Sequence, residues 1–224
     1  TVTDNLTFDN SGEQIITGLA DLTLQGGFIL EDGLLSSTGG KVSFEKGAGQ
    51  SGGSLDVSGS TWGLGGNFEK DNGTLTMLQT TLKLEDNSTL TSDVSLNFEN
   101  LNLNDFTLTL GSLTSDLTVE NTITIDASGE GILTGGADLL LSALTLSAGD
   151  VTSTGGIVSL SGGGQLSGTG KLDVSGSTWG LGGDFVKSSG TLTISQTNLA
   201  LSGNSKLTSD EALSFVTLNL NNLK

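Results

Sequence analysis

The sequence predicts an all-β fold in which short strands stack as a parallel β-solenoid, also called a parallel β-helix. Three observations lead to this prediction: apolar and polar residues alternate over short segments, Gly-rich stretches separate those segments, and the chain contains a long internal repeat. No segment carries a persuasive 3.6-residue period, and strong helix formers are sparse, so we expect almost no helix.

The alternation marks the expected strands. It is clearest in residues 119–125 and 213–220, where every second residue is apolar over much of the segment. In the second half of the chain, apolar pairs centre near Ile125, Ile132, Leu139, Leu144, Val158, Leu172, Phe185, Leu192, Leu199, Leu213 and Leu220. The usual step is about seven residues, or twice that where a Gly-rich stretch intervenes, which indicates short strands divided by turns.

The internal repeat is long and specific. The twelve residues 55–66 return letter for letter as residues 172–183, which is 117 positions later. The sequence therefore predicts one elongated domain, residues 1–224, built from two tandem units: residues 1–117 and a truncated second copy, residues 118–224.

The coil length follows from the strand spacing. Three strands of about seven residues make a coil of roughly 20–23 residues, so the chain should form about 10–11 coils. Stacked at ~4.8 Å, these coils would extend over roughly 50 Å. We expect Leu, Ile, Val and Phe inside, Thr, Ser and Asn outside, and Gly with positive φ at the corners. The absence of Pro agrees with a fold in which each coil donates its N–H groups to the next.

Composition limits the function. The net charge of −17 argues against nucleic acid as a partner and against binding to anionic lipid. The absence of Cys excludes disulfides and thiolate metal sites. No apolar run of about 18 residues is present, so no membrane insertion is expected. Residues 1–4 lack the features of a signal peptide, and both ends lie in mid-pattern, which suggests a piece of a longer array.

The low-complexity runs resemble a family. Residues 108–115, 161–168 and 190–194 are examples of Gly-, Ser-, Thr- and Leu-rich runs that look like the passenger regions of large bacterial surface proteins, the filamentous-haemagglutinin-like adhesins and autotransporter passengers. The resemblance covers the whole chain and implies a right-handed parallel β-helix, export to the bacterial cell surface, and a stalk or adhesive role. It supplies no functional residues.

Together these observations predict a structural and adhesive repeat shaft of a large exported bacterial surface protein, with a host or neighbouring cell surface, including its glycans, as partner. Residues 1–117 carry −12 (16 acids, four lysines) and the remainder −5 (nine acids, four lysines), which discourages lateral clumping. Unpaired strand edges at the two ends predict weak end-to-end self-association. The alternative is a carbohydrate-binding or polysaccharide-degrading β-helix module.

Two tryptophans are the candidates for carbohydrate stacking. Trp62 and Trp179 occupy the same place in the two copies and are the only tryptophans of the chain. An indole could provide a platform for a sugar ring, but an aromatic that buries its ring at a Gly-rich corner is the commoner case.

Two aspartates are the candidates for calcium. Several acids recur in both copies: Asp9/Asp126, Glu13/Glu130, Asp21/Asp138, Asp56/Asp173 and Asp93/Asp210. The stretch that ends at Asp56 faintly resembles a calcium-binding nonapeptide, which makes Asp56 and Asp173 the candidate ligands. The competing interpretation, which we favour, is a solvated turn in which the aspartate bonds its own backbone.

No catalytic residue is predicted. Paired acids could serve a polysaccharide lyase or hydrolase, but the chain has no His, Arg or Tyr to carry protons or clamp charge. The Thr-x-Thr triplets are too widely spaced for ice binding, which needs one in nearly every coil.

Overall fold

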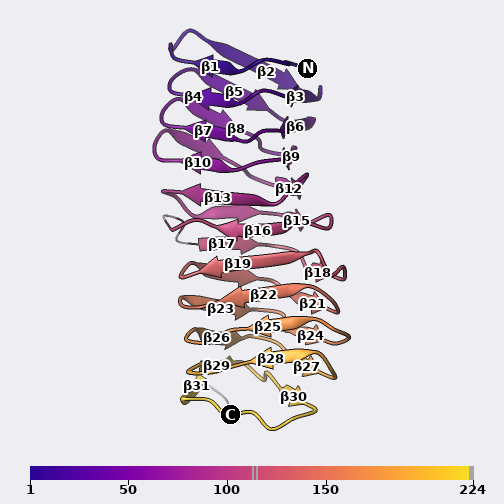
Figure 1. The fold of residues 1–224 in the computed structure, drawn as a ribbon. Coiled ribbons are helices and arrows are strands. Elements are labelled where there is room, and N and C mark those ends of the chain that lie inside the picture. The colour runs from indigo at the N-terminus through magenta and orange to yellow at the C-terminus, as the bar shows by residue number, and fades with distance from the viewer. Residues whose placement is uncertain (113, 115, 222–224) are drawn as a thin grey trace. The chain divides into compact units, whose positions relative to one another are not determined.

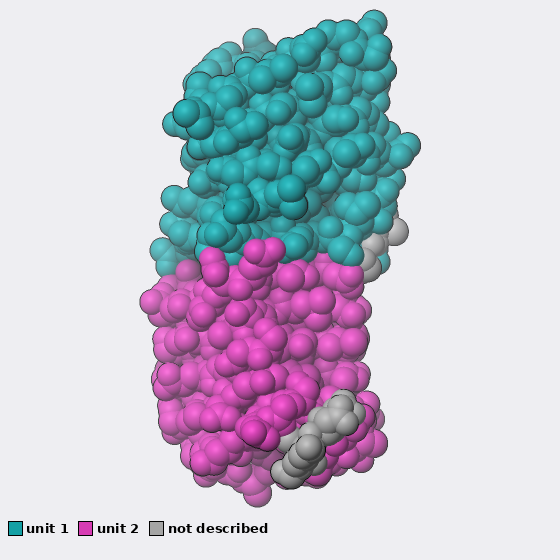
Figure 2. Space-filling model, turned by 180° about the vertical axis from the view of Figure 1, so that it is seen from behind, with its two compact units in different colours: residues 1–114 teal, residues 115–224 magenta. Residues whose placement is uncertain are grey.

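The computed structural model describes residues 1–112, 114 and 116–221, and in this part of the chain every regular element is a strand. The strands are parallel and stack in a β-solenoid of about 11 turns, which confirms the predicted fold class. The chain forms two compact units, residues 1–114 and residues 115–224 (Figure 2). This division lies close to the repeat boundary that the sequence predicts after residue 117.

In unit 1 the chain passes in turn through three faces, and the strands of each face lie one beneath another (Figure 1). The β1 face holds β1 (Leu6–Phe8), β4 (Phe28–Leu30), β7 (Ala48–Gln50), β10 (Phe68–Lys70), β13 (Ser88–Ser92) and β16 (Thr107–Leu110). The β2 face holds β2 (Gln14–Gly18), β5 (Leu34–Ser37), β8 (Ser54–Asp56) and β11 (Thr74–Thr76). The β3 face holds β3 (Leu22–Leu24), β6 (Lys41–Phe44), β9 (Thr61–Leu64), β12 (Thr81–Leu84) and β15 (Asn100–Asn102), and β14 (Leu96–Phe98) precedes β15 along the chain.

Unit 2 repeats the three-faced arrangement. The β17 face holds β17 (Asp116–Val119), β20 (Asp138–Leu141), β23 (Ile157–Leu160), β26 (Thr178–Leu181), β29 (Asn198–Ser202) and β31 (Thr217–Asn221). The β18 face holds β18 (Ile123–Ile125), β21 (Leu144–Leu146), β24 (Gly164–Leu166), β27 (Phe185–Lys187) and β30 (Leu207–Ser209). The β19 face holds β19 (Gly131–Gly135), β22 (Asp150–Ser153), β25 (Lys171–Asp173) and β28 (Thr191–Thr193).

The strand register gives the coil length directly. Val42 pairs with Trp62 and Trp62 with Leu82, so these two coils have 20 residues each. Across the described pairs the step ranges from 19, as between Leu82 and Leu101, to 22, as between Leu6 and Phe28, and it falls to 18 at the register shift where Gly135 pairs with Ser153. The coils are therefore slightly shorter than the 20–23 residues expected from the sequence.

The interior consists of ladders of apolar side chains, as the alternation predicts. Along β4, Phe28 and Leu30 point inward and are buried, while Ile29 between them is exposed. Aromatic rings also meet inside the coils: Phe8 and Phe28 of neighbouring coils lie edge to face at a centroid distance of 5.7 Å, and Phe28 stacks across the core on Phe44 of the β3 face at 5.4 Å. Burial of this apolar surface is the main source of stability in a chain without disulfides.

Glycines occupy corners that no other residue fits. Gly73 has φ +82°, and a Cβ placed on it would lie 2.3 Å from the carbonyl oxygen of Gly52 in the preceding coil. Because neighbouring coils approach so closely at this corner, a side chain would push them apart. The predicted use of Gly at positive φ is confirmed here and at Gly190, the equivalent residue of unit 2.

The Gly-rich stretches also contain strands, which the apolar pattern did not indicate. Strand β24 contains only one apolar inward residue, Leu166, yet it pairs in register with β21 and β27. In the other direction, the long alternation at 119–125 is divided between β17 and β18, and only residues 217–221 of the expected strand at 213–220 are extended.

Hydroxyl groups are not confined to the outside, so the expectation that Ser and Thr lie there is wrong in part. Several Ser and Thr residues are buried at the corners, where they bond to an adjacent coil. The hydrogen bonds run from Ser60 Oγ to Ser37 Oγ (2.9 Å), between Ser153 Oγ and Ser177 Oγ (2.9 Å), from Thr80 Oγ1 to the Val57 carbonyl (2.9 Å), and from Thr197 Oγ1 to the Val174 carbonyl (2.8 Å). These bonds satisfy polar groups that would otherwise be buried without a partner.

Candidate functional site

The two tryptophans lie in the core, so the hypothesis that they stack against sugars is wrong. Trp62 in β9 and Trp179 in β26 are both 0% exposed. Each indole packs edge-on against a phenylalanine, Trp62 against Phe68 at 4.8 Å and Trp179 against Phe185 at 4.9 Å between centroids. A sugar ring cannot stack on an indole that has no exposed face. The two indoles instead fill the interior between strands.

Asp56 and Asp173, the candidate calcium ligands, both close turns. Asp56 Oδ1 accepts the backbone N–H of Ser58 at 3.0 Å, and Asp173 Oδ1 accepts that of Ser175 at 2.9 Å. No group of three or more Asp, Glu, His or Cys side chains in the described part of the chain has the geometry of a metal site. Calcium binding at these residues stays a prediction.

Other acids shared by the two copies also support the backbone. Asp21 Oδ1 accepts the N–H of Lys41 at 2.8 Å, and Asp138 Oδ1 accepts that of Ile157 at 2.7 Å. In each case the donor lies one coil further along the chain, so the carboxylate fastens two coils at a corner. Glu13 stabilises its own turn, because its Oε2 accepts the backbone N–H of Asp9 at 2.7 Å. The recurrence of these acids therefore reflects the fold.

A buried lysine occurs at the same place in each unit, and the sequence interpretation missed both. Lys70 is 1% exposed and Lys187 is 3% exposed, since each follows an inward phenylalanine by two residues on its strand. Lys70 Nζ lies 2.5 Å from Asp93 Oδ1, and Lys187 Nζ lies 2.5 Å from Asp210 Oδ1. A buried ammonium needs such a partner, because its desolvation is otherwise uncompensated.

Unit 2 surrounds its lysine with two carboxylates. Glu211 Oε1 lies 3.1 Å from Lys187 Nζ, in addition to Asp210. The hydrogen bond to Asp210 raises the pKa of Lys187 above its ordinary value, although burial opposes this shift. The same hydrogen bond lowers the pKa of the Asp210 carboxyl. The pair is therefore charged over the whole neutral range.

These shifts predict how stability depends on pH. The lowered pKa of Asp210 contributes stability that is complete above the unfolded value of ~3.9 and is lost as the pH falls through the folded pKa. The raised pKa of Lys187 contributes stability that is complete below ~10.4 and is lost as the pH rises through its folded pKa. Replacing Asp210→Asn should therefore weaken the pH dependence of the urea midpoint on the acid side, below about pH 5. The exposed Asp126→Asn serves as control, and an unchanged acid limb in the Asp210 variant would contradict this assignment.

A polar groove on the outer surface of the β3 face is the strongest candidate site in unit 1. Its volume is about 400 Å³, and its lining is Thr23, Lys41, Ser43, Glu45, Gly65, Glu85 and Asp86. The floor is formed by Gly63 of β9 and by Gly65, which directly follows this strand, and neither residue carries a side chain. A hollow therefore opens between the side chains of β6 and those at the end of β12.

The side chain of Glu85 lies across this floor. A Cβ on Gly63 would lie 2.9 Å from Glu85 Oε1 and 3.0 Å from Lys41 Cε. Glu85 forms an ion pair with Lys41 and accepts a hydrogen bond from Ser43 Oγ at 2.5 Å. Burial raises the pKa of Glu85, but the hydrogen bonds from Lys41 and Ser43 outweigh it, and the net pKa is lowered. Glu85 is thus held as a carboxylate with fixed orientation.

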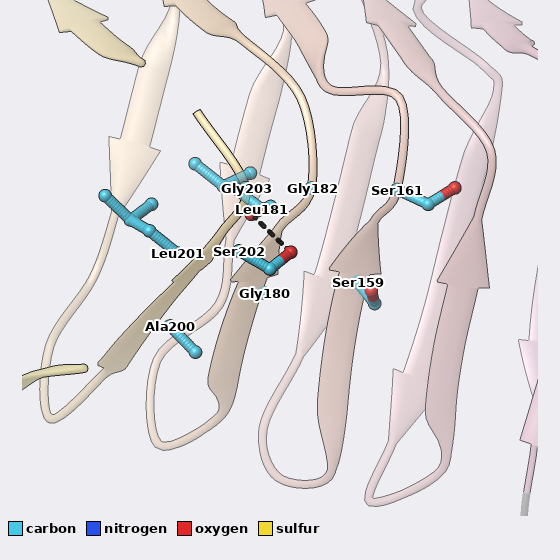
Figure 3. Close-up of a pocket in the computed structure, with 9 residues that line it drawn as sticks. All are labelled: Ser159, Ser161, Gly180, Leu181, Gly182, Ala200, Leu201, Ser202 and Gly203. Carbon is cyan, nitrogen blue, oxygen red and sulfur yellow. Dashed lines mark hydrogen bonds between the residues drawn. The ribbon is translucent and has the colours of Figure 1, made fainter. Parts of the chain in front are cut away.

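Unit 2 has a hollow at the equivalent place, with a different lining. Figure 3 shows it on the β17 face, where its volume is about 490 Å³. The lining is Ser159, Ser161, Gly180, Leu181, Gly182, Ala200, Leu201, Ser202 and Gly203. A second hollow of about 420 Å³ shares Ser159 and Ser161 with it. Neither hollow places a lysine or more than one carboxylate in its lining.

Comparison of the chain with models of protein families, with curated proteins and with solved structures finds no match. Within the described residues, no helix has both the length and the apolar character that crossing a bilayer would require. The case for a function therefore depends on the geometry of the chain itself.

Proposed function

We propose that this chain is a structural and adhesive repeat shaft of a large exported bacterial surface protein, with a host or neighbouring cell surface as its partner. The observation that carries the proposal is the continuity of the parallel ladders within each unit. On the β1 face of unit 1, β1, β4, β7, β10, β13 and β16 pair in sequence, so that each of the strands β4 to β13 bonds to the strand one coil before it and to the strand one coil after it. A pull along the stack must break several backbone hydrogen bonds together.

The distribution of side chains supports the same role. The acids and lysines common to the two units fasten turns or occupy the core, as Asp21 and Lys70 do. They stabilise a unit that can be added in tandem without redesign. The excess of acids over lysines gives the chain a net charge of −17, which limits lateral association.

Single-molecule force spectroscopy tests the shaft. The chain is held by handles at its two termini, and a helical bundle of equal length is pulled in the same way. We expect the solenoid to resist higher force and to lengthen in coil-sized steps. Extension at or below the force that opens the bundle would contradict a load-bearing role. Beads coated with the chain, compared with albumin-coated beads on cell monolayers, test adhesion separately.

The groove on the β3 face favours a second candidate function, the binding of carbohydrate. Its hydroxyl and carboxylate groups, from Ser43, Glu45, Glu85 and Asp86, are of the kind that hydrogen-bond sugar hydroxyls. Because the tryptophans are buried, such binding would depend on polar contacts. The proposal covers binding and not cleavage, because nothing identifies a glycosidic bond between two of the groove's carboxylates.

A further inference from the structure

We propose that the groove on the β3 face of unit 1 binds oligosaccharides that carry free amino groups, such as glucosamine oligomers. This inference depends on the second candidate function above and names the class of sugar. The groove holds the ammonium group against Glu45, Glu85 and Asp86, while Thr23 faces the sugar hydroxyls and Ser43 orients Glu85 from beneath. The equivalent hollow of unit 2 does not bind the same ligand.

The charged network of the groove is not needed for the fold, because unit 2 folds without it. Ser43 has a serine counterpart in Ser159, and the glycines of the floor persist as Gly180 and Gly182. The charged residues are replaced at the same strand positions: Lys41 by Ile157, Glu45 by Ser161, Lys83 by Ala200, Glu85 by Ser202 and Asp86 by Gly203. Unit 2 is thus a natural variant in which the shape of the hollow is kept and its charge is removed.

Of the two floor glycines of unit 2, Gly182 is required by packing, because a Cβ on it would lie 2.6 Å from the carbonyl oxygen of Ser161, whereas Gly180 is retained without a steric need. In unit 2, a Cβ on Gly180 would approach no atom more closely than 3.4 Å, and the residue does not have a positive φ. A glycine inside a strand lowers its stability, and it often marks a place where a ligand comes close to the backbone. The duplicated Trp-Gly-Leu-Gly segment therefore preserves a hollow in both units. In unit 1, the charged side chains of the groove lining determine which ligand binds there.

The charge of the groove favours a cation. Lys41 is neutralised by Glu85, whereas the exposed carboxylate of Glu45 has no ion-pair partner in the described part of the chain. Asp86 Oδ1 accepts only the N–H of its neighbour, Asn87. Lys83 is the remaining cation on this part of the face, so carboxylates exceed ammonium groups within a unit that is itself strongly acidic. The excess of carboxylates attracts an ammonium group on the ligand and repels an anionic sugar.

The floor favours a sugar over a peptide. An extended peptide binds best at a free strand edge, where its backbone can continue the ladder. The floor strand β9 has no free edge, because it pairs with β6 on one side and with β12 on the other. A peptide in the groove would leave its N–H and C=O groups without backbone partners. Sugar hydroxyls and amines can instead bond to the side chains that stand around the floor.

The binding experiment uses three β-1,4-linked oligomers of equal length, made of glucosamine, N-acetylglucosamine or glucose, which differ only at the second carbon of each ring. Titration calorimetry of the intact chain should show binding of the glucosamine oligomer at one site, weakened by added salt because the contact is ionic. The acetylated and neutral oligomers should bind at least about tenfold more weakly. Tetralysine serves as a cation that is not a sugar.

Two variants locate the site. Glu45→Gln, which removes an exposed carboxylate without a partner, should weaken glucosamine binding about tenfold and leave the melting temperature unchanged. Glu85→Gln should weaken glucosamine binding as well, and it should also lower the melting temperature slightly, because it breaks the ion pair with Lys41. The matched control is Glu69→Gln, which removes one exposed carboxylate from the β1 face of the same unit and should change nothing.

A gain of binding in unit 2 provides the complementary test. The triple variant Ile157→Lys, Ser161→Glu, Ser202→Glu restores most of the groove lining on the β17 face, where the glycine floor is already present. We expect the number of glucosamine sites to rise from one to two. A stoichiometry that stays at one while the variant remains folded would overturn the assignment of these residues.

The outcomes separate the inference from the functions on which it depends. Equal binding of the three oligomers would overturn the amine preference and leave carbohydrate binding intact. No binding of any oligomer would overturn both, without bearing on the shaft. Binding of tetralysine as tightly as the glucosamine oligomer would show a general cation site and overturn the sugar assignment.

Discussion

Replacing Trp62→Ala is expected to destabilise unit 1 by ~3–5 kcal/mol. The indole is fully buried and packs against Phe44, Phe68 and Phe98. Alanine would leave a cavity that the surrounding ladders cannot close, because each ring is fixed by the strand that carries it. Urea unfolding followed by near-UV circular dichroism should show the loss as a lower midpoint.

The control for this prediction is Leu78→Ala, at an apolar residue of the same unit that is 71% exposed. Its effect should stay within ~0.5 kcal/mol. If Trp62→Ala unfolded at the wild-type midpoint but lost its affinity for oligosaccharides, the indole would be a binding platform after all. That result would contradict a purely structural role for Trp62.

Replacing Gly163→Ala is expected to cost ~3 kcal/mol or more, the sum of left-handed strain and a broken hydrogen bond. Gly163 has φ +86°, and its Cβ would lie 2.0 Å from the carbonyl oxygen of Asp184 in the next coil. That carbonyl accepts the N–H of Gly164 at 2.8 Å, so separating the coils to relieve the collision breaks this bond. Thermal unfolding of purified variants measures the difference.

Gly136→Ala is the matched control, since a Cβ there meets nothing within 4 Å and the residue has no positive φ. It should leave the melting temperature unchanged or raise it slightly, because alanine restricts the unfolded chain. Equal effects of the two substitutions would mean that the close contact between coils at Gly163 is not formed in solution.

The fold could be predicted because both of its signals are local in the sequence. Side-chain alternation marks each strand, and the 117-residue repeat indicates that similar units follow one another. Alternation fails where side chains are missing or polar: β24 presents Gly164 and Leu166 inward, and a single leucine does not make a pattern. The buried Lys70 was not identified from the sequence, although its two-residue spacing from Phe68 placed it on the inward side of its strand. Its carboxylate partner, Asp93, recurs with it in the second copy as Asp210.

The groove could not be predicted from local sequence. The contrast between Glu85-Asp86 and Ser202-Gly203 is visible in the repeat. Ser43 and Glu85, however, are 42 residues apart, and the coil that contains β9 lies between their two coils. They meet only because Gly63 on β9 has no side chain, so that Glu85 can reach across it. An accurate coil length was needed to place these residues on one face, and the lengths vary between 18 and 22 residues.

The measurement that tests the stacked parallel coils most directly is disulfide cross-linking in a chain that has no cysteine of its own. Thr145 on β21 pairs in register with Gln165 on β24, which pairs in turn with Val186 on β27, and all three side chains point outward. Residues one coil apart lie ~4.8 Å apart, within reach of a disulfide, whereas residues two coils apart lie beyond it. Oxidation should therefore close a disulfide in the double variant Thr145→Cys, Gln165→Cys and not in Thr145→Cys, Val186→Cys. Closure of the second pair, or failure of the first, would contradict the stacking of one coil upon the next.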